Sequence, residues 1–172
     1  MGRNLPLKTR IHDAEGIGKR SMFRGATKVT LDEKGRMVMP TRHREQIAER
    51  AQGRVVVTVD SRDRCLLIYP LPEWELIETK LMSLPTLNEE ARRLQRLMVG
   101  HAVDLELDGH GRILLPPELR EFASLERHGM LIGQGSRFEL WSESTWGERL
   151  EEMLKSGKAT TGLPSEFDSL SL

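Results

Sequence analysis

Apolar and polar residues alternate over residues 26–31, and this period-two pattern predicts a half-buried β-strand. The turn-forming run Asp32–Gly35 follows, in which Gly35 can adopt the positive φ that a tight turn requires. Apolar residues at 37–39 predict a second short strand directly after the turn. The patterned part of the chain therefore begins with strand, tight turn and strand.

Helix and strand patterns continue in the same half of the chain. A helix is predicted over residues 40–51, because Pro40 suits the first turn of a helix and Gly53 closes it. Two apolar runs on either side of a polar turn predict further strands over residues 55–59 and 65–69. Two more helices are predicted, over residues 72–83 and 88–99.

An internal repeat organises the whole chain. The segment Leu31–Pro40 recurs 76 residues later as Leu107–Pro116, with Asp, Gly, Arg and Pro identical, and Arg44 falls on Arg120. A looser match places Tyr69–Trp74 on residues 141–146. One half has too few strands to cover its own apolar faces. The two halves are therefore expected to complete one shared core as a pseudo-symmetric unit.

The edges of the repeat define the expected domain organisation. Repeat 1 is expected over residues 22–75, repeat 2 over 101–147, and connecting helices over 76–100. Residues 1–21 hold five basic and two acidic residues without periodicity, which predicts a disordered N-terminal extension. Residues 148–172 are expected to form the end of a helix and a flexible tail.

Composition excludes several classes of protein. The 172 residues contain 26 Lys and Arg and 26 Asp and Glu, so a uniformly basic, histone-like binder is excluded. Cys65 is the single cysteine, which permits no internal disulfide, and it is expected to be packed in a strand. No apolar run approaches the roughly 18 residues that span a bilayer. These features predict a soluble cytoplasmic protein.

The repeated motif has both a structural and a functional interpretation. The glycine permits the turn, the aspartate accepts hydrogen bonds from turn N–H groups, and the arginine presents five donors just past the bend. In the structural interpretation, the aspartate and arginine form only a salt bridge within the hairpin. The residues assigned to the structural motif are Asp32, Gly35 and Arg44 in the first copy, and Asp108, Gly111 and Arg120 in the second.

Charge distinguishes the two copies. Residues 22–44 contain six basic and two acidic residues, whereas the equivalent residues 98–120 contain two basic and four acidic ones. A basic hairpin surface is the expected footprint of phosphate contact, and arginine adds bidentate recognition of guanine or phosphate. A solvated charged face explains the same charges about as well.

Five segments in order closely resemble the MraZ family of bacterial transcriptional regulators, which contain two SpoVT/AbrB-type repeats. The matching segments are Met22–Gly25, Leu31–Arg36, Pro70–Trp74, Leu107–Arg112 and Phe138–Trp141. The resemblance implies an α+β fold, mainly β, in which two internal repeats form a pseudo-symmetric double swapped-hairpin (AbrB-like) barrel with peripheral helices. It also implies a homo-oligomeric ring.

The resemblance further implies a DNA-binding repressor of the division and cell-wall gene cluster, including its own gene, located in the cytoplasm on the nucleoid. Double-stranded promoter DNA with tandem repeats is the expected partner, with no membrane, small-molecule substrate or cofactor. Arg36 is expected to read base edges and Arg112 to contribute more weakly, because its surroundings are acidic. Arg44 suits DNA contact or an ion pair with Asp32. The residues expected to hold phosphates are Arg24, Lys28, Lys34 and Arg42.

Other functions find less support in the sequence. Swapped-hairpin proteins also occur as antitoxins whose flexible tails wrap a partner protein, and the loose C-terminus permits that alternative. An enzyme is not expected, because no acid, base and nucleophile converge. The segment 16–19 lacks the flanking residues of a phosphate-binding loop. His101 and His110 lack companion ligands, so no metal site is expected.

Overall fold

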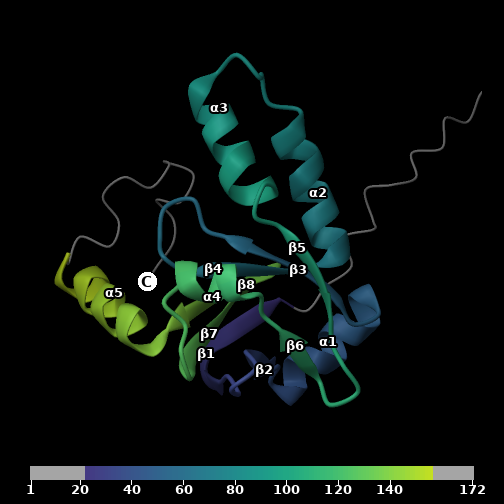
Figure 1. The fold of residues 1–172 in the computed structure, drawn as a ribbon, viewed down its shortest axis with the longest axis vertical. Coiled ribbons are helices and arrows are strands. Elements are labelled where there is room, and N and C mark those ends of the chain that lie inside the picture. Colours follow the sequence, from purple (N-terminus) through teal and green to yellow (C-terminus); the bar gives the residue numbers. More distant parts are fainter. Residues whose placement is uncertain (1–21, 157–172) are drawn as a thin grey trace, which may run out of the picture.

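The computed structural model describes residues 22–156, which form eight strands, five α-helices and one π-helical segment (Figure 1). The predicted N-terminal extension and the predicted tail from residue 157 onward lie outside the described residues. Within residues 22–156, the helices lie around the strands, as expected for an α+β fold with peripheral helices.

The two repeats contain the same elements in the same order. Each reads strand, strand, helix, strand, strand, helix, which confirms the repeat predicted from the sequence. Repeat 1 comprises β1 (Phe23–Thr30), β2 (Arg36–Val38), α1 (Thr41–Ala51), β3 (Arg54–Val59), β4 (Leu66–Pro70) and α2 (Leu71–Met82). Between the repeats lie α3 (Glu89–Leu94) and the π-helix η1 (Gln95–Val99). Repeat 2 comprises β5 (Val103–Glu106), β6 (Arg112–Leu114), α4 (Pro117–Phe122), β7 (His128–Gly135), β8 (Arg137–Ser142) and α5 (Glu143–Lys155).

Local sequence explains where the helices begin and end. Pro40 precedes α1, and the helix ends at Gln52 and Gly53, whose φ values of 54° and 81° are left-handed. Asn88 begins α3 by accepting a hydrogen bond from Ala91 N at 3.0 Å. The single helix predicted over 88–99 instead ends as η1, where Thr58 Oγ1 donates to Met98 O at 2.6 Å. This bond from β3 satisfies a carbonyl at the end of the helix.

Strand pairing exchanges elements between the repeats. The six-stranded antiparallel sheet has the order β1-β7-β8-β4-β3-β5, so the first strand of each repeat pairs with the third strand of the other. β4 and β8 pair at the centre. A separate two-stranded sheet joins β2 to β6, with Met37 opposite Ile113. Neither repeat can therefore form its sheet alone.

The swapped-hairpin barrel that the resemblance implies is not confirmed, because the strands of residues 22–156 do not close into a barrel. Hydrogen bonding in the large sheet ends at β1 on one side and β5 on the other, and β2 with β6 stands apart from it. The reason is the strand pairing, because β2 and β6 pair with each other and β1 and β5 each have a sheet partner on one side only. A single bridge between Leu31 and Met37 connects β1 to β2. The confirmed fold is thus α+β with an open antiparallel sheet.

The main core is built jointly by both repeats. Met37 and Ile113 have no exposed surface, and they join one cluster with residues from nearly every strand. Trp74 lies against Tyr69 with ring centroids 5.6 Å apart and an interplanar angle of 51°, and the ring centroid of Trp141 lies 5.6 Å from that of Trp146.

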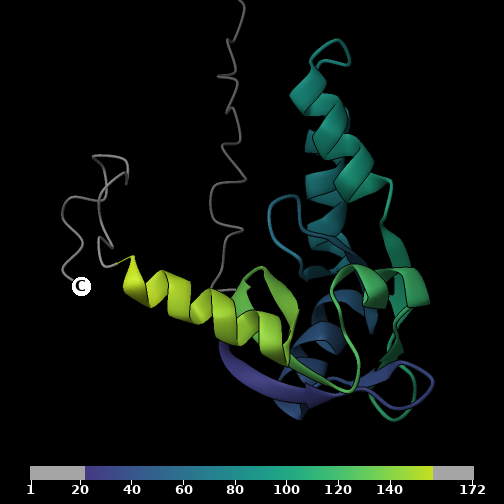
Figure 2. The same ribbon diagram turned by 60° about the vertical axis from the view of Figure 1, so that its left-hand side comes forward.

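The helices α2 and α3 form an arm that projects from the sheets, and α5 extends along another side of the molecule (Figures 1 and 2). β2, β6 and the turns that precede them lie at the end opposite this arm. Trp74 of α2 and Met98 of η1 belong to the second, smaller core cluster, at the base of the arm.

Two neighbouring residues of β2 test the joint core. We expect Met37→Ala to reduce the free energy of unfolding by about 2–5 kcal/mol, because a fully buried side chain leaves a cavity. Val38→Ala, on the exposed side of the same strand, should cost less than about 1 kcal/mol. Urea denaturation followed by circular dichroism measures both. Equally small losses would contradict the placement of Met37 between the repeats.

Candidate nucleic-acid interface

The two-stranded sheet of β2 and β6, here called the ribbon, presents one face to the core and one to solvent. Met37 and Ile113 point inward and are fully buried. On the outer face, Arg36 lies opposite Leu114 and Val38 lies opposite Arg112. Val38 and Leu114 are 45% and 54% exposed. The outer face therefore combines two arginines, one from each repeat, with two aliphatic side chains.

The first turn orders Arg36 through Asp32. Asp32 Oδ1 accepts hydrogen bonds from Lys34 N at 3.0 Å and Arg36 N at 2.9 Å. Asp32 Oδ2 accepts from Arg36 Nε at 2.6 Å, while the arginine side chain remains 32% exposed. The ion pair uses only Nε, so the terminal nitrogens have no hydrogen-bond partner among residues 22–156. The structural and functional interpretations of this motif are thus compatible.

The second turn repeats this geometry. Asp108 Oδ1 accepts from His110 N at 2.8 Å and Arg112 N at 2.9 Å, and Oδ2 accepts from Arg112 Nε at 2.8 Å. The hydrogen bond from the Arg112 backbone N–H contributes most to lowering the pKa of Asp108 to about 2. The corresponding bond from Arg36 also lowers the pKa of Asp32. Both turns therefore depend on an ionised carboxylate.

In each turn, residues of the other repeat pack against the glycine. Gly35 has a φ of +84°, and a Cβ at this position would lie 2.5 Å from Arg120 Nε of α4. Leu115 N also donates to Gly35 O at 3.0 Å. In the second turn, a Cβ on Gly111 would overlap the Arg44 side chain of α1. Each glycine thus permits close packing of an arginine that the other repeat supplies.

Arg44 belongs to this packing. Its Nε donates to Met39 O at 2.7 Å and its Nη1 to His110 O at 3.3 Å. The ion pair with Asp32, one of two interpretations of Arg44, is wrong. The reason is geometric, because α1 directs Arg44 across to the second turn while Asp32 lies in the first.

The four cations that were predicted to hold phosphates differ in their exposure and in their hydrogen-bond partners. Arg24 on β1 and Lys34 in the first turn are exposed. Arg42 donates from Nη2 to Thr27 Oγ1 at 3.0 Å. Lys28 donates to Glu143 Oε1 of α5 at 2.7 Å, so part of its charge is already compensated. Arg36 and Arg112 therefore lie together on the ribbon, whereas Lys28 forms an ion pair with α5.

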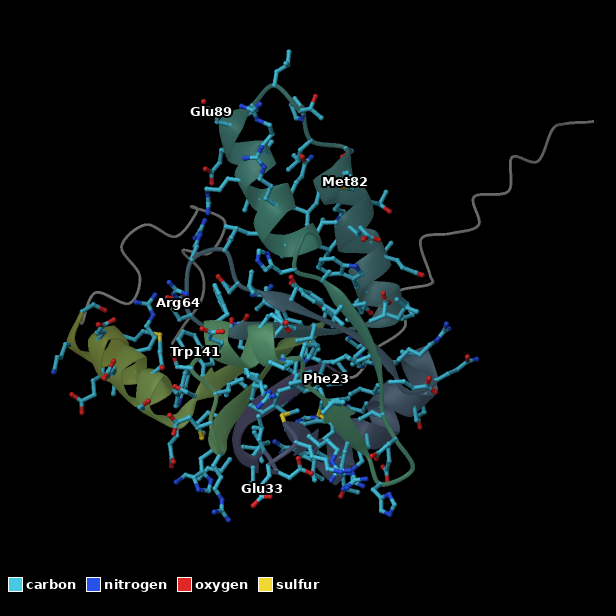
Figure 3. The ribbon with its side chains drawn as sticks, in the orientation of Figure 1. Phe23, Glu33, Arg64, Met82, Glu89 and Trp141 are labelled. Carbon is cyan, nitrogen blue, oxygen red and sulfur yellow. The ribbon has the colours of Figure 1, made fainter. Side chains whose placement is uncertain are left out.

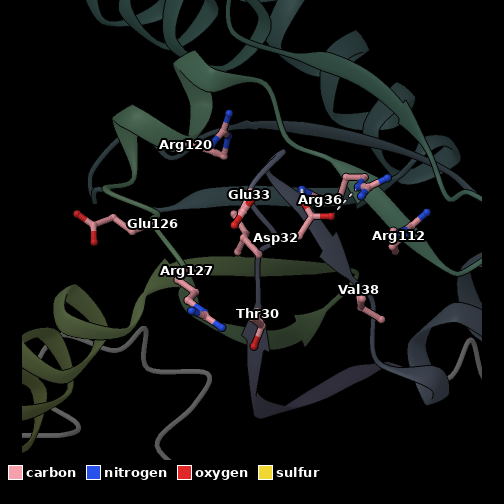
Figure 4. A pocket seen from close by; sticks show the side chains of 10 residues that line it. Thr30, Asp32, Glu33, Arg36, Val38, Arg112, Arg120, Glu126 and Arg127 are labelled. Atoms are coloured by element: carbon pink, nitrogen blue, oxygen red, sulfur yellow. Dashed lines mark hydrogen bonds and ion pairs between the residues drawn. The ribbon is translucent and has the colours of Figure 1, made fainter.

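A hollow of about 740 Å³ lies beside the first turn (Figure 4). The ribbon contributes Arg36, Val38 and Arg112 to its lining. Glu126 and Arg127, which connect α4 to β7, also line it, although sequence reasoning did not select either residue. No local motif marks this pair, because the strand exchange places it beside the first turn. The other lining residues are Thr30, Leu31, Asp32, Glu33 and Arg120.

No group of three or more His, Cys, Asp or Glu side chains in residues 22–156 is placed to hold a metal ion. None of the helices in the same range combines the length and apolar character needed to cross a membrane. The buried Cys65 has its pKa raised, chiefly by desolvation, which disfavours the reactive thiolate.

Comparison with known proteins gives matches over most of the chain. The family model described as "MraZ protein, putative antitoxin-like" matches residues 22–97 and again residues 98–162. The chain is 57% identical over 152 residues to the transcriptional regulator MraZ of Azotobacter vinelandii (strain DJ), covering 88% of this chain and all of that protein. It is 54% identical over 151 residues to that of Pseudomonas aeruginosa (strain LESB58), with the same coverage.

The lowered pKa of Asp108 predicts a loss of stability in acid. Its folded pKa of about 2 lies below the ordinary aspartate pKa of 3.8, so the carboxylate stabilises the fold fully above the unfolded pKa. That contribution is lost as pH falls through the folded value. We expect Asp108→Asn to lower the urea midpoint near neutral pH, and the difference from wild type to shrink as pH approaches 2.

Asp104→Asn provides the control for this experiment. Asp104 is an exposed carboxylate on β5 with no hydrogen bond to its side chain among the described residues. Its replacement should change the urea midpoint little at either pH. A difference between wild type and Asp108→Asn that stays constant down to pH 2 would contradict the assigned role of the carboxylate.

Proposed function

The chain belongs to the MraZ family of transcriptional regulators, and we propose that it regulates transcription by binding double-stranded promoter DNA with the outer face of the ribbon. The observation that carries this proposal is the pairing of β2 with β6, which places Arg36 and Arg112 on one exposed face. A two-stranded ribbon fits the major groove of B-DNA, and several β-ribbon proteins read DNA in this way.

The ribbon's side chains suit base recognition. The terminal nitrogens of Arg36 are available for bidentate contact with guanine O6 and N7, because Asp32 holds only Nε and fixes the direction of the side chain. Val38 and Leu114 supply exposed apolar surface beside the arginines, which suits contact with thymine methyl groups. Arg36 is the proposed principal reader, and Arg112 the secondary one.

Phosphate contacts position the ribbon in this proposal. Arg24, Lys34 and Arg42 present positive charge outside the ribbon, and phosphate contacts of this kind set register without reading sequence. Lys28 is a weaker candidate than the sequence indicated, because it must first leave Glu143. Both turns contribute to DNA binding through structure, since each fixes an arginine and is packed by the opposite repeat.

Regulation follows from repeated contacts. We propose that copies of the chain form a ring, which would present identical ribbons to tandem promoter repeats and raise the effective concentration of each later contact. The reciprocal strand exchange supports the swapped-hairpin arrangement that the family resemblance implies. Repression of the division and cell-wall gene cluster, including the chain's own gene, and location on the nucleoid in the cytoplasm belong to the same proposal. No catalytic step is needed.

A second candidate function is binding of a partner protein as an antitoxin-like module. The description of the matching family model favours it. So do three exposed apolar side chains on α5, which directly precedes the proposed partner-binding tail. Leu150, Met153 and Leu154 are 39%, 46% and 73% exposed. The tail itself lies outside the described residues, so the ribbon carries the stronger case.

The proposed reader is tested by an alanine variant and a structurally matched control. We expect Arg36→Ala to weaken binding to DNA from upstream of the protein's own gene by about 1–3 kcal/mol, with a smaller effect on unrelated DNA. Arg112→Ala removes the same charge and the equivalent ion pair with Asp108, but should weaken specific binding less. Gel-shift titrations at two salt concentrations measure both.

Circular dichroism and urea unfolding show whether each variant keeps its fold. Promoter binding by folded Arg36→Ala that is as tight as wild type would refute the assignment of Arg36. Wild-type binding that does not distinguish the promoter from unrelated DNA would refute sequence specificity.

A further inference from the structure

Arg127 is fixed at the base of the first turn by its backbone. Leu31 N donates to Arg127 O at 2.8 Å, and the neighbouring residues Thr30 and His128 are paired across β1 and β7. The Arg127 side chain is exposed and has no hydrogen-bond or ion-pair partner within residues 22–156. The structure thus holds the backbone firmly while leaving the guanidinium available for a ligand.

The hollow of about 740 Å³ separates Arg127 from the ribbon. Arg36, Val38 and Arg112 lie on its ribbon side, and Glu126 and Arg127 lie on the other side, with the Arg127 side chain directed towards Thr30 (Figure 4). Any polymer that lies along the outer face of the ribbon and fills this hollow therefore meets Arg127.

The lining of the hollow carries both signs of charge, and Arg127 is the exposed arginine in it. Asp32 is already paired with Arg36, so the carboxylates left without a cation in the lining are Glu33 and Glu126. Arg120 donates through Nε to Leu115 O and keeps its positive charge. A phosphate group beside Arg127 would gain a charge-assisted contact, while the adjacent Glu126 would oppose it.

The equivalent place in the other repeat holds no side chain. Leu107 N donates to Gly53 O at 2.9 Å, which is the counterpart of the bond from Leu31 N to Arg127 O. Gly53 therefore occupies the position of Arg127 at the base of the second turn. The pseudo-symmetric ribbon therefore has a cation, Arg127, at the base of its first turn and a glycine at the equivalent position of its second turn.

We infer that the hollow is a second DNA-contact site, in which the sugar–phosphate backbone beside the first turn binds Arg127. This inference rests on the proposed function. Repeat 2 then contributes directly to DNA binding through a residue outside its Asp-x-x-Gly-Arg motif. Because Gly53 offers no matching contact, Arg127 also gives the ribbon one preferred orientation on an otherwise pseudo-symmetric contact.

A salt titration with Arg127→Ala tests this site. One phosphate contact contributes about 0.9 to the slope of log affinity against log salt, so its loss should weaken binding about eightfold at 0.1 M salt. The slope is negative, and it should become less steep by about one, equally for promoter and unrelated duplexes. Fluorescence anisotropy with labelled duplexes measures both quantities. The alanine variant retains the backbone bond to Leu31.

Two further variants make the result specific to this place. Arg92→Ala removes an equal charge from α3. This helix begins at Glu89, which lies at the opposite end of the molecule from Glu33 in the first turn (Figure 3). It should leave the slope unchanged. Glu126→Gln removes the opposing carboxylate and should tighten binding to both duplexes.

The outcomes separate the two proposals. If Arg127→Ala behaves like Arg92→Ala while Arg36→Ala still loses promoter binding, the second site is refuted and the proposed function stands. If loss at Arg127 is confined to the promoter sequence, the assignment to phosphate is refuted. Failure of the wild-type protein to bind either duplex would overturn both.

Discussion

The pairing of β2 with β6 is the constraint on which the rest of the structure depends. One three-residue strand from each repeat forms the ribbon, with Met37 and Ile113 buried on its inner side. The same pairing places Arg36 and Arg112 together on its outer side. The exchange of β1 and β5 between repeats ensures that neither half completes its sheet alone. The same strand pairing therefore completes the core and builds the candidate interface.

The two repeats hold their turns by the same contacts but differ in the side chains around these turns. In both turns an aspartate orients an arginine, and a glycine makes room for an arginine from the other repeat. Around this common frame, repeat 1 carries the basic surface, whereas repeat 2 adds Arg112 and Arg127. In the proposed function, this difference makes the contact of a pseudo-symmetric fold with DNA asymmetric.

Local patterns were sufficient to predict the elements and the turn chemistry. Pro40 and Gly53 marked the limits of α1, and the recurrence of Leu31–Pro40 revealed the duplication. Non-local pairing was not predictable in this way: it leaves the sheet open and brings Arg127 beside the first turn. Arg36 was selected because the turn is local, whereas Arg127 was missed because only the strand exchange makes it a neighbour.

Photo-cross-linking from the ribbon tests the central claim most directly. A photoreactive amino acid replacing the exposed Val38 would lie between the two arginines, and one replacing the exposed Leu76 of α2 would lie on the arm. Both variants would be irradiated with the labelled upstream duplex. The ribbon account predicts a protein–DNA cross-link from position 38 and none from position 76. Cross-linking from position 76 alone would contradict it.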